Sequence, residues 1–113
     1  MSAEENERWM DRFRRLAKNI QAAEYTLIKR EAQVKKLQAQ HKVSALDSGI
    51  KTSSAQETYA ESQEDLYLAR LEIGVAKGAL SAARVELKAL EVGFEEWRTR
   101  SANKREEMKR YGA

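Results

Sequence analysis

The stretch from Leu66 to Val92 most constrains the fold, because it carries two apolar stripes on one predicted helix. Both stripes advance by steps of three and four residues, the spacing that lines up side chains on a helix face. With Leu66 as heptad position a, the first stripe occupies positions a and d and comprises Leu66, Ala69, Ile73, Ala76, Leu80, Ala83, Leu87 and Leu90. The second occupies positions c and f and comprises Leu68, Leu71, Val75, Gly78, Ala82, Val85, Ala89 and Val92.

Composition agrees with long helices. The 113 residues include no proline and five glycines, so few positions interrupt a helix. Hydrophobic residues make up 42% of the chain and recur at helical spacing, which argues against an intrinsically disordered protein. We therefore expect an all-α fold and, from the length, a single domain over residues 1–113.

A first helix is predicted over about residues 4–46, because an apolar seam starting at Trp9 alternates steps of four and three. The break at Asp47-Ser48-Gly49 predicts a turn over residues 47–53, with Gly49 as a left-handed helix cap. The seam comprises Trp9, Phe13, Leu16, Ile20, Ala23, Leu27, Arg30, Val34, Leu37, His41 and Ser44.

A second, unbroken helix is predicted over about residues 54–110. Ser53 with Gln56, and Ser54 with Glu57, have the spacing of capping boxes and mark its start. Its seam is expected to begin weakly, with Tyr59 and Ser62, before the apolar run.

Two long helices joined by a short turn are expected to form an antiparallel two-helix coiled-coil hairpin. Centring the turn near residue 51 makes facing residue numbers sum to about 103. Large side chains then meet small ones, as with Leu27 and Ala76. The same register places Trp9 on Phe94 with Trp97 beside them, Arg30 near Glu72, and His41 beside Ser62.

The c/f stripe has no partner within this hairpin, since the second stripe of helix one is interrupted by Lys29 and Lys36. We expect a second copy to cover it, giving a homodimer that forms a four-helix bundle. Gly74 and Gly78 would let two backbones approach closely, or are simply tolerated on the surface. The predicted self-association residues are Leu68, Leu71, Val75, Gly78, Ala82, Val85 and Val92.

Nothing in the sequence points to catalysis, a metal or a cofactor. The chain has no cysteine, and its one histidine, His41, is interpreted as structural. The carboxylates lie among charges of both signs, so no pair is set apart for acid–base chemistry. There is no glycine-rich phosphate loop. We expect a protein that is not an enzyme.

Basic residues gather toward the two chain ends, although the net charge is only +3. They suggest contacts with phosphate groups or with an acidic protein. The alternative is a solvated surface neutralised by acids such as Glu4, Glu5 and Asp11. The candidate contact residues are Arg12, Arg14, Arg15, Arg98, Arg100, Lys104, Arg105, Lys109 and Arg110.

The favoured function is a non-enzymatic assembly module that self-associates and binds an unidentified protein; the alternative is a nucleic-acid-binding protein. The length also resembles that of the small helical hairpins secreted by type-VII systems. Those carry Trp-x-Gly at the turn, whereas this turn reads Leu46-Asp47-Ser48-Gly49-Ile50. The acidic first residues are unlike a signal peptide, and no apolar run approaches a membrane span, so a cytoplasmic protein without membrane contact is expected.

Overall fold

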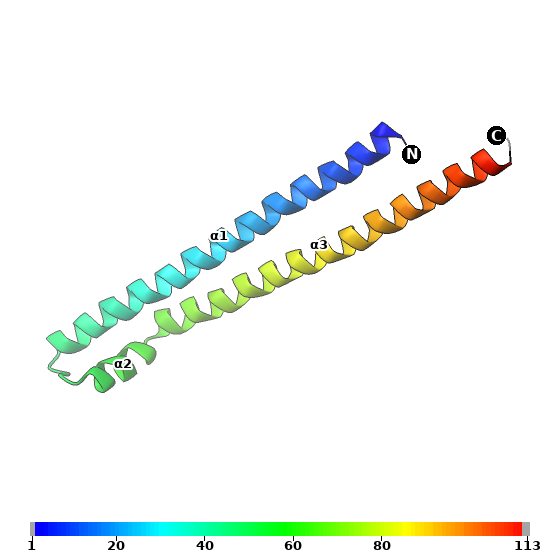
Figure 1. Cartoon of the computed structure of the whole chain (residues 1–113). Coiled ribbons are helices and arrows are strands. Elements are labelled where there is room, and N and C mark those ends of the chain that lie inside the picture. The colour runs from blue at the N-terminus through cyan, green and yellow to red at the C-terminus, as the bar shows by residue number, and fades with distance from the viewer. Residues whose placement is uncertain (1, 112–113) are drawn as a thin grey trace. The chain divides into compact units, whose positions relative to one another are not determined.

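The computed structural model describes residues 2–111 and consists of helices joined by short connections (Figure 1). They are α1 (Ala3–Asp47), α2 (Ser53–Glu61) and α3 (Glu64–Arg110), and the described residues contain no strand. The predicted all-α class is confirmed. The first helix matches its predicted range of about 4–46 within a residue at either end.

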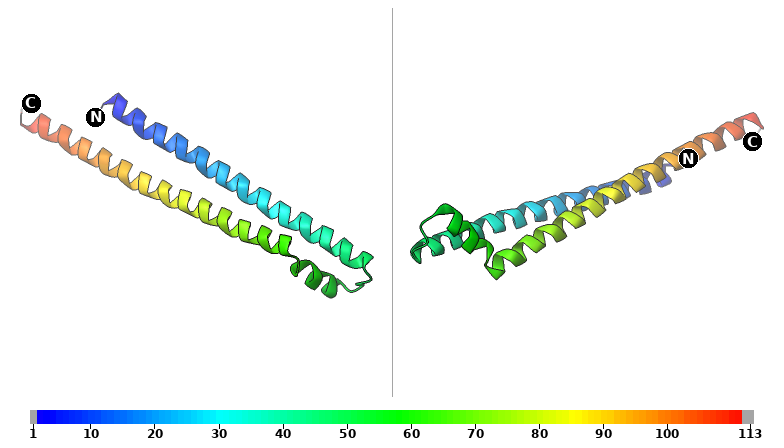
Figure 2. Two further views of the ribbon diagram at one scale, coloured as in Figure 1. Left: turned by 180° about the vertical axis from the view of Figure 1, so that it is seen from behind. Right: turned by 90° about the horizontal axis from the view of Figure 1, so that it is seen from below.

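Contacts between residues divide the chain into two compact units. The turn unit is Ala22–Leu80, and the aromatic unit is Met1–Gln21 with Ser81–Ala113. In each unit a segment of α1 pairs antiparallel with a segment of α3, as in a helical hairpin; Figure 2 gives two further views of these helices. The expectation that the whole chain is one domain stays a prediction.

The end of α1 is a Schellman motif, as the sequence predicted from Gly49. This glycine has φ +92°, a conformation that residues with a Cβ rarely adopt. Its N–H donates to the Leu46 carbonyl at 3.0 Å, and the Ile50 N–H donates to the Ala45 carbonyl at 3.0 Å. Two carbonyls at the helix end are thereby satisfied, and the chain turns at once toward α2.

The start of α2 lies one residue earlier than the capping boxes predicted. Thr52 is the N-cap, with extended backbone angles, and its Oγ1 accepts from the Ala55 N–H at 3.2 Å. Gln56 donates from Nε2 to the Ile50 carbonyl at 2.9 Å, which ties the helix back to the turn. The serines at positions 53 and 54 therefore lie inside the helix.

The prediction of one unbroken helix over 54–110 is wrong, because the chain breaks at Ser62 and Gln63. Both side chains donate to the Tyr59 carbonyl, from Ser62 Oγ at 2.6 Å and from Gln63 Nε2 at 3.1 Å. The Gln63 N–H bonds the carbonyl three residues back, at Ala60, which tightens the last turn of α2. Local side-chain bonds thus replace the continuation of the helix.

The break changes which residues face α1. Ala60 and Leu66 are both completely buried. On one straight helix, six residues would rotate them by about 240° relative to each other, so both could not face the same neighbour. Ser62, predicted in the seam, is exposed. The break therefore lets α2 and α3 each turn an apolar residue inward.

The core of the turn unit is aliphatic. Val34 from α1 packs in one cluster with Ala60, Leu66 and Ala69, and Leu37 lies against this cluster, in the predicted register. Arg30 Nη1 lies 3.0 Å from a carboxylate oxygen of Glu72, also as predicted.

Two details near the turn differ from the predicted seam. His41 pairs with Asp65, at 2.6 Å from Nε2 to Oδ1, and not with Ser62. The break takes Ser62 out of the seam, and Asp65 in the first turn of α3 contacts the histidine instead. At the end of α1, Ala45 is fully buried while Ser44 is exposed, because the last step of the seam is four residues and not three.

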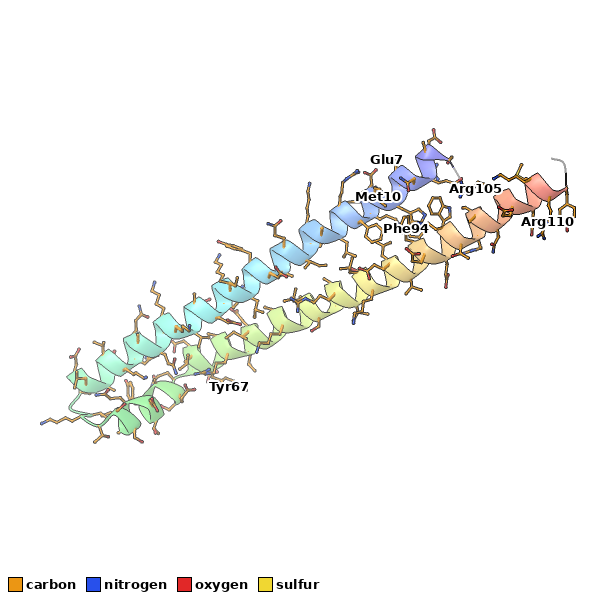
Figure 3. The ribbon with its side chains drawn as sticks, viewed as in Figure 1. Glu7, Met10, Tyr67, Phe94, Arg105 and Arg110 are labelled. Carbon is orange, nitrogen blue, oxygen red and sulfur yellow. The ribbon has the colours of Figure 1, made fainter. Side chains whose placement is uncertain are left out.

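The core of the aromatic unit is built from rings, as predicted. Trp9 lies 5.7 Å from Phe94 and 6.0 Å from Trp97 between ring centroids, and Phe13 meets Phe94 edge-on at 5.6 Å. Phe94 lies on the side of α3 that faces α1 (Figure 3). Trp97 also donates from Nε1 to Glu5 at 2.9 Å, so its polar edge is satisfied near the surface.

Candidate interaction surfaces

The outer stripe of α3, at heptad positions c and f, is exposed in the turn unit. Leu68 and Leu71 are half exposed, and Val75 is 75% exposed. A Cβ built on Gly78 would meet no atom within 4 Å. Positions c and f lie roughly 160° around the helix from the buried a and d positions, so α1 does not cover them.

The same stripe is exposed in the aromatic unit. Val85 is 67% exposed and Val92 is 59% exposed, and Ala82 is also exposed. The structure thus places every predicted self-association residue at the surface.

A second exposed stripe lies on α1 in the turn unit, and the sequence reasoning underrated it. With Val34 as position a, the stripe uses positions b, c and f, on the side of α1 away from the core. Ile28, three residues after Tyr25, adds an apolar residue beside the interruption at Lys29. The large exposed residues of this stripe are Tyr25 (67%), Ile28 (65%), Val43 (59%) and Leu46 (54%).

Two of the candidate basic residues of α1 in the aromatic unit interact with side chains of the same helix. Arg14 contacts Glu7 at 3.0 Å and Asp11 at 2.6 Å, and its hydrogen bond to Glu7 raises its pKa. The Arg12 guanidinium lies 5.1 Å from the Trp9 ring centroid. Arg15 is exposed beside them.

The basic residues of α3 are distributed over more than one face of the helix. Arg98 contacts Glu95 at 3.3 Å and lies over Phe94, and Arg100 lies 3.9 Å from Glu96. Arg105 and Arg110 project from different sides of the helix (Figure 3). By helix geometry Lys109 shares the face of Arg105, and Lys104 shares the face of Arg100, because each pair is four residues apart.

A shallow concavity of about 370 Å³ lies beside the rings of Trp9 and Trp97. Its charges are mixed, because Glu5 and Asp11 line it together with arginines. Within residues 2–111, no three histidine, aspartate or glutamate side chains come together as metal ligands. His41 is engaged with Asp65 in the turn unit.

Comparisons of the chain with protein-family models, curated proteins and solved structures find no match. Among the described helices, none combines the length and the apolar character needed to cross a bilayer.

Proposed function

We propose that this chain is a non-enzymatic assembly module that binds a second copy of itself through the outer stripe of α3, and that the assembly then presents its charged flanks to a protein partner. The observation that carries the proposal is the burial contrast on α3. Leu66 and Leu68 lie two residues apart with the same side chain, yet the first is fully buried and the second is half exposed.

Exposed apolar residues are ordinary when scattered, but a row at helical spacing is a feature of interfaces. Leu68, Leu71 and Val75 form such a row on the segment of α3 that belongs to the turn unit. Two hairpins joined through it bring four helices together, which is the assembly predicted from the sequence. The repeated spacing favours a helix as the covering partner.

The test compares charged substitutions on the two faces of α3. Leu71→Glu should reduce the assembly to single chains and retain most of the helix content, because its side chain is half exposed. Leu80→Glu should instead unfold the pairing with α1, since Leu80 is only 6% exposed. Light scattering gives the molar mass, and circular dichroism gives the helix content. An unchanged mass for Leu71→Glu would contradict the proposal.

A further inference from the structure

The concavity beside Trp9 and Trp97 in the aromatic unit combines two indole rings with a row of arginines. These are the only two tryptophans of the chain, and both are half-buried. Arg8, Arg12 and Arg15 line the same concavity from α1, where steps of four and three residues place them on one face of the helix. This arginine row extends about 10 Å along the helix axis. Flat aromatic groups and a line of positive charge therefore lie side by side.

The acidic side chains of this concavity are already engaged within the chain. Glu5 accepts a hydrogen bond from Trp97 Nε1 at 2.9 Å, and Asp11 contacts Arg14, which lies outside the concavity, at 2.6 Å. The three arginines of the row are exposed, and within residues 2–111 none of them forms an ion pair. The groups left to bind a ligand are therefore positively charged.

Two further acids border the arginine row at its ends. Glu4 lies one helical turn before Arg8, and Glu86 of α3 lines a separate depression with Arg12 and Arg15. In the described part of the chain neither acid pairs with the row. The aromatic unit has 13 basic and 10 acidic residues, whereas the turn unit has eight of each. The whole net charge of +3 therefore belongs to the unit that carries the concavity.

From this combination we propose that the concavity binds single-stranded nucleic acid, with the arginine row on successive phosphates and a base against the indole rings. Proteins that bind single strands join a basic track for the backbone to aromatic rings on which bases stack. A row about 10 Å long suits a chain of phosphates more than one isolated anion. The inference goes beyond the proposed function and does not depend on self-association, because the outer stripe of α3 takes no part in it.

The two tryptophans report on this site directly, because both line it. A fluorescently labelled oligothymidylate of about 12 nucleotides should bind the wild-type chain by anisotropy, with a dissociation constant of about 1–100 μM, and should quench the tryptophan fluorescence. Three phosphate contacts predict that the logarithm of the affinity falls with the logarithm of the salt concentration with a slope of about −2. No binding at low salt, or binding without quenching, would contradict the inference.

An abasic strand of the same length separates base stacking from attraction to an anionic polymer. It carries the same phosphates, but it should bind the wild-type chain at least about fivefold more weakly, because no base can stack. Equal affinity for the two strands would show a site for anionic polymers only, and the inference would be wrong. Displacement of oligothymidylate by an equal concentration of polyglutamate would show a site for acidic protein segments, which also overturns it.

A pair of double variants tests the arginine row. Arg8→Gln with Arg15→Gln should weaken oligothymidylate binding about tenfold and reduce the salt slope by about 1.4, whereas Arg12 is retained because it packs on Trp9. The control is Arg105→Gln with Arg110→Gln, which removes the same charge from the same unit outside the concavity (Figure 3). Equal weakening by both double variants would contradict recognition through the row. The abasic comparison uses the wild-type chain and therefore stands even if a variant loses helix content.

Discussion

The inner and outer stripes of α3 have the same spacing and similar residues, but opposite surroundings. On the inner stripe Leu66 is completely buried and Leu80 is 6% exposed; on the outer stripe Leu71 and Val75 are half exposed or more. The inner stripe is covered because the turn returns the chain along it. The comparison teaches that helical spacing predicts a face that will be buried, while the connection determines whether the same chain buries it.

Alanine substitution of leucines on the two stripes should give the largest difference in unfolding free energy. Leu66→Ala removes a fully buried side chain and should lower the free energy of unfolding by about 2–5 kcal/mol, through lost transfer energy and a residual cavity. Leu68→Ala removes a half-exposed one and should cost less than about 1 kcal/mol in dilute solution. Urea unfolding at low protein concentration measures both. Similar losses would mean that the outer stripe is buried within the single chain.

Alanine substitution of two glycines of α3 should change the unfolding free energy by a smaller amount. A Cβ at Gly74 meets open space, so Gly74→Ala should raise the unfolding free energy by up to about 1 kcal/mol through helix propensity. A Cβ at Gly93 would lie 3.3 Å from a ring carbon of Trp9, so Gly93→Ala should gain less, because the ring must shift. Thermal unfolding of dilute samples compares them. A larger gain at position 93 would contradict the close approach of Trp9.

The sequence predicted both long helices, the Gly49 cap and the meeting of Trp9 with Phe94, because spacing and turn chemistry are local signals. It failed at Ser62 and Gln63, where no proline or glycine marks a break. A signal was nevertheless present, since Ser62 and Asp65 have the spacing of a capping box before an apolar run. The heptad pattern obscured this signal, because Ser62 fell at a position of the predicted seam. In the structure Ala60 is the buried residue there and Ser62 is exposed.

Of the two exposed stripes, the sequence predicted the one on α3 and missed most of the one on α1. The α3 stripe is apolar at nearly every step and was found from its spacing alone. The α1 stripe lacks an apolar residue at Lys35 and Lys36, and Ile28 lies at position b and not c, so a strict seam misses it. Exposure of Ile28 and Tyr25 in the folded unit identifies the stripe.

The smallest expected effect concerns Glu61, which links the segments on either side of the break. Arg70 donates from Nε to Glu61 at 3.0 Å, and Gln38 of α1 donates to it at 3.2 Å. The hydrogen bond from Arg70 lowers the pKa of Glu61. This contribution to stability is present above the usual carboxyl pKa of about 4.3 and is lost as the pH falls through the lowered value.

A carbon-detected NMR titration of Glu61 should therefore give a pKa below that of an ordinary glutamate, and Arg70→Ala should return it toward the usual value. Lys77→Ala, which removes a cation on the same face of α3 two turns beyond Arg70, is the control and should leave the titration unchanged. A normal pKa in the wild type would show that the pair with Arg70 does not persist in solution.

Sedimentation of the wild-type chain over a concentration series tests the central claim most directly. If a second copy covers the outer stripe of α3, the weight-average mass rises above that of one chain, 12.9 kDa, by tens of micromolar. A mass that stays at one chain throughout the series would contradict self-association through this stripe.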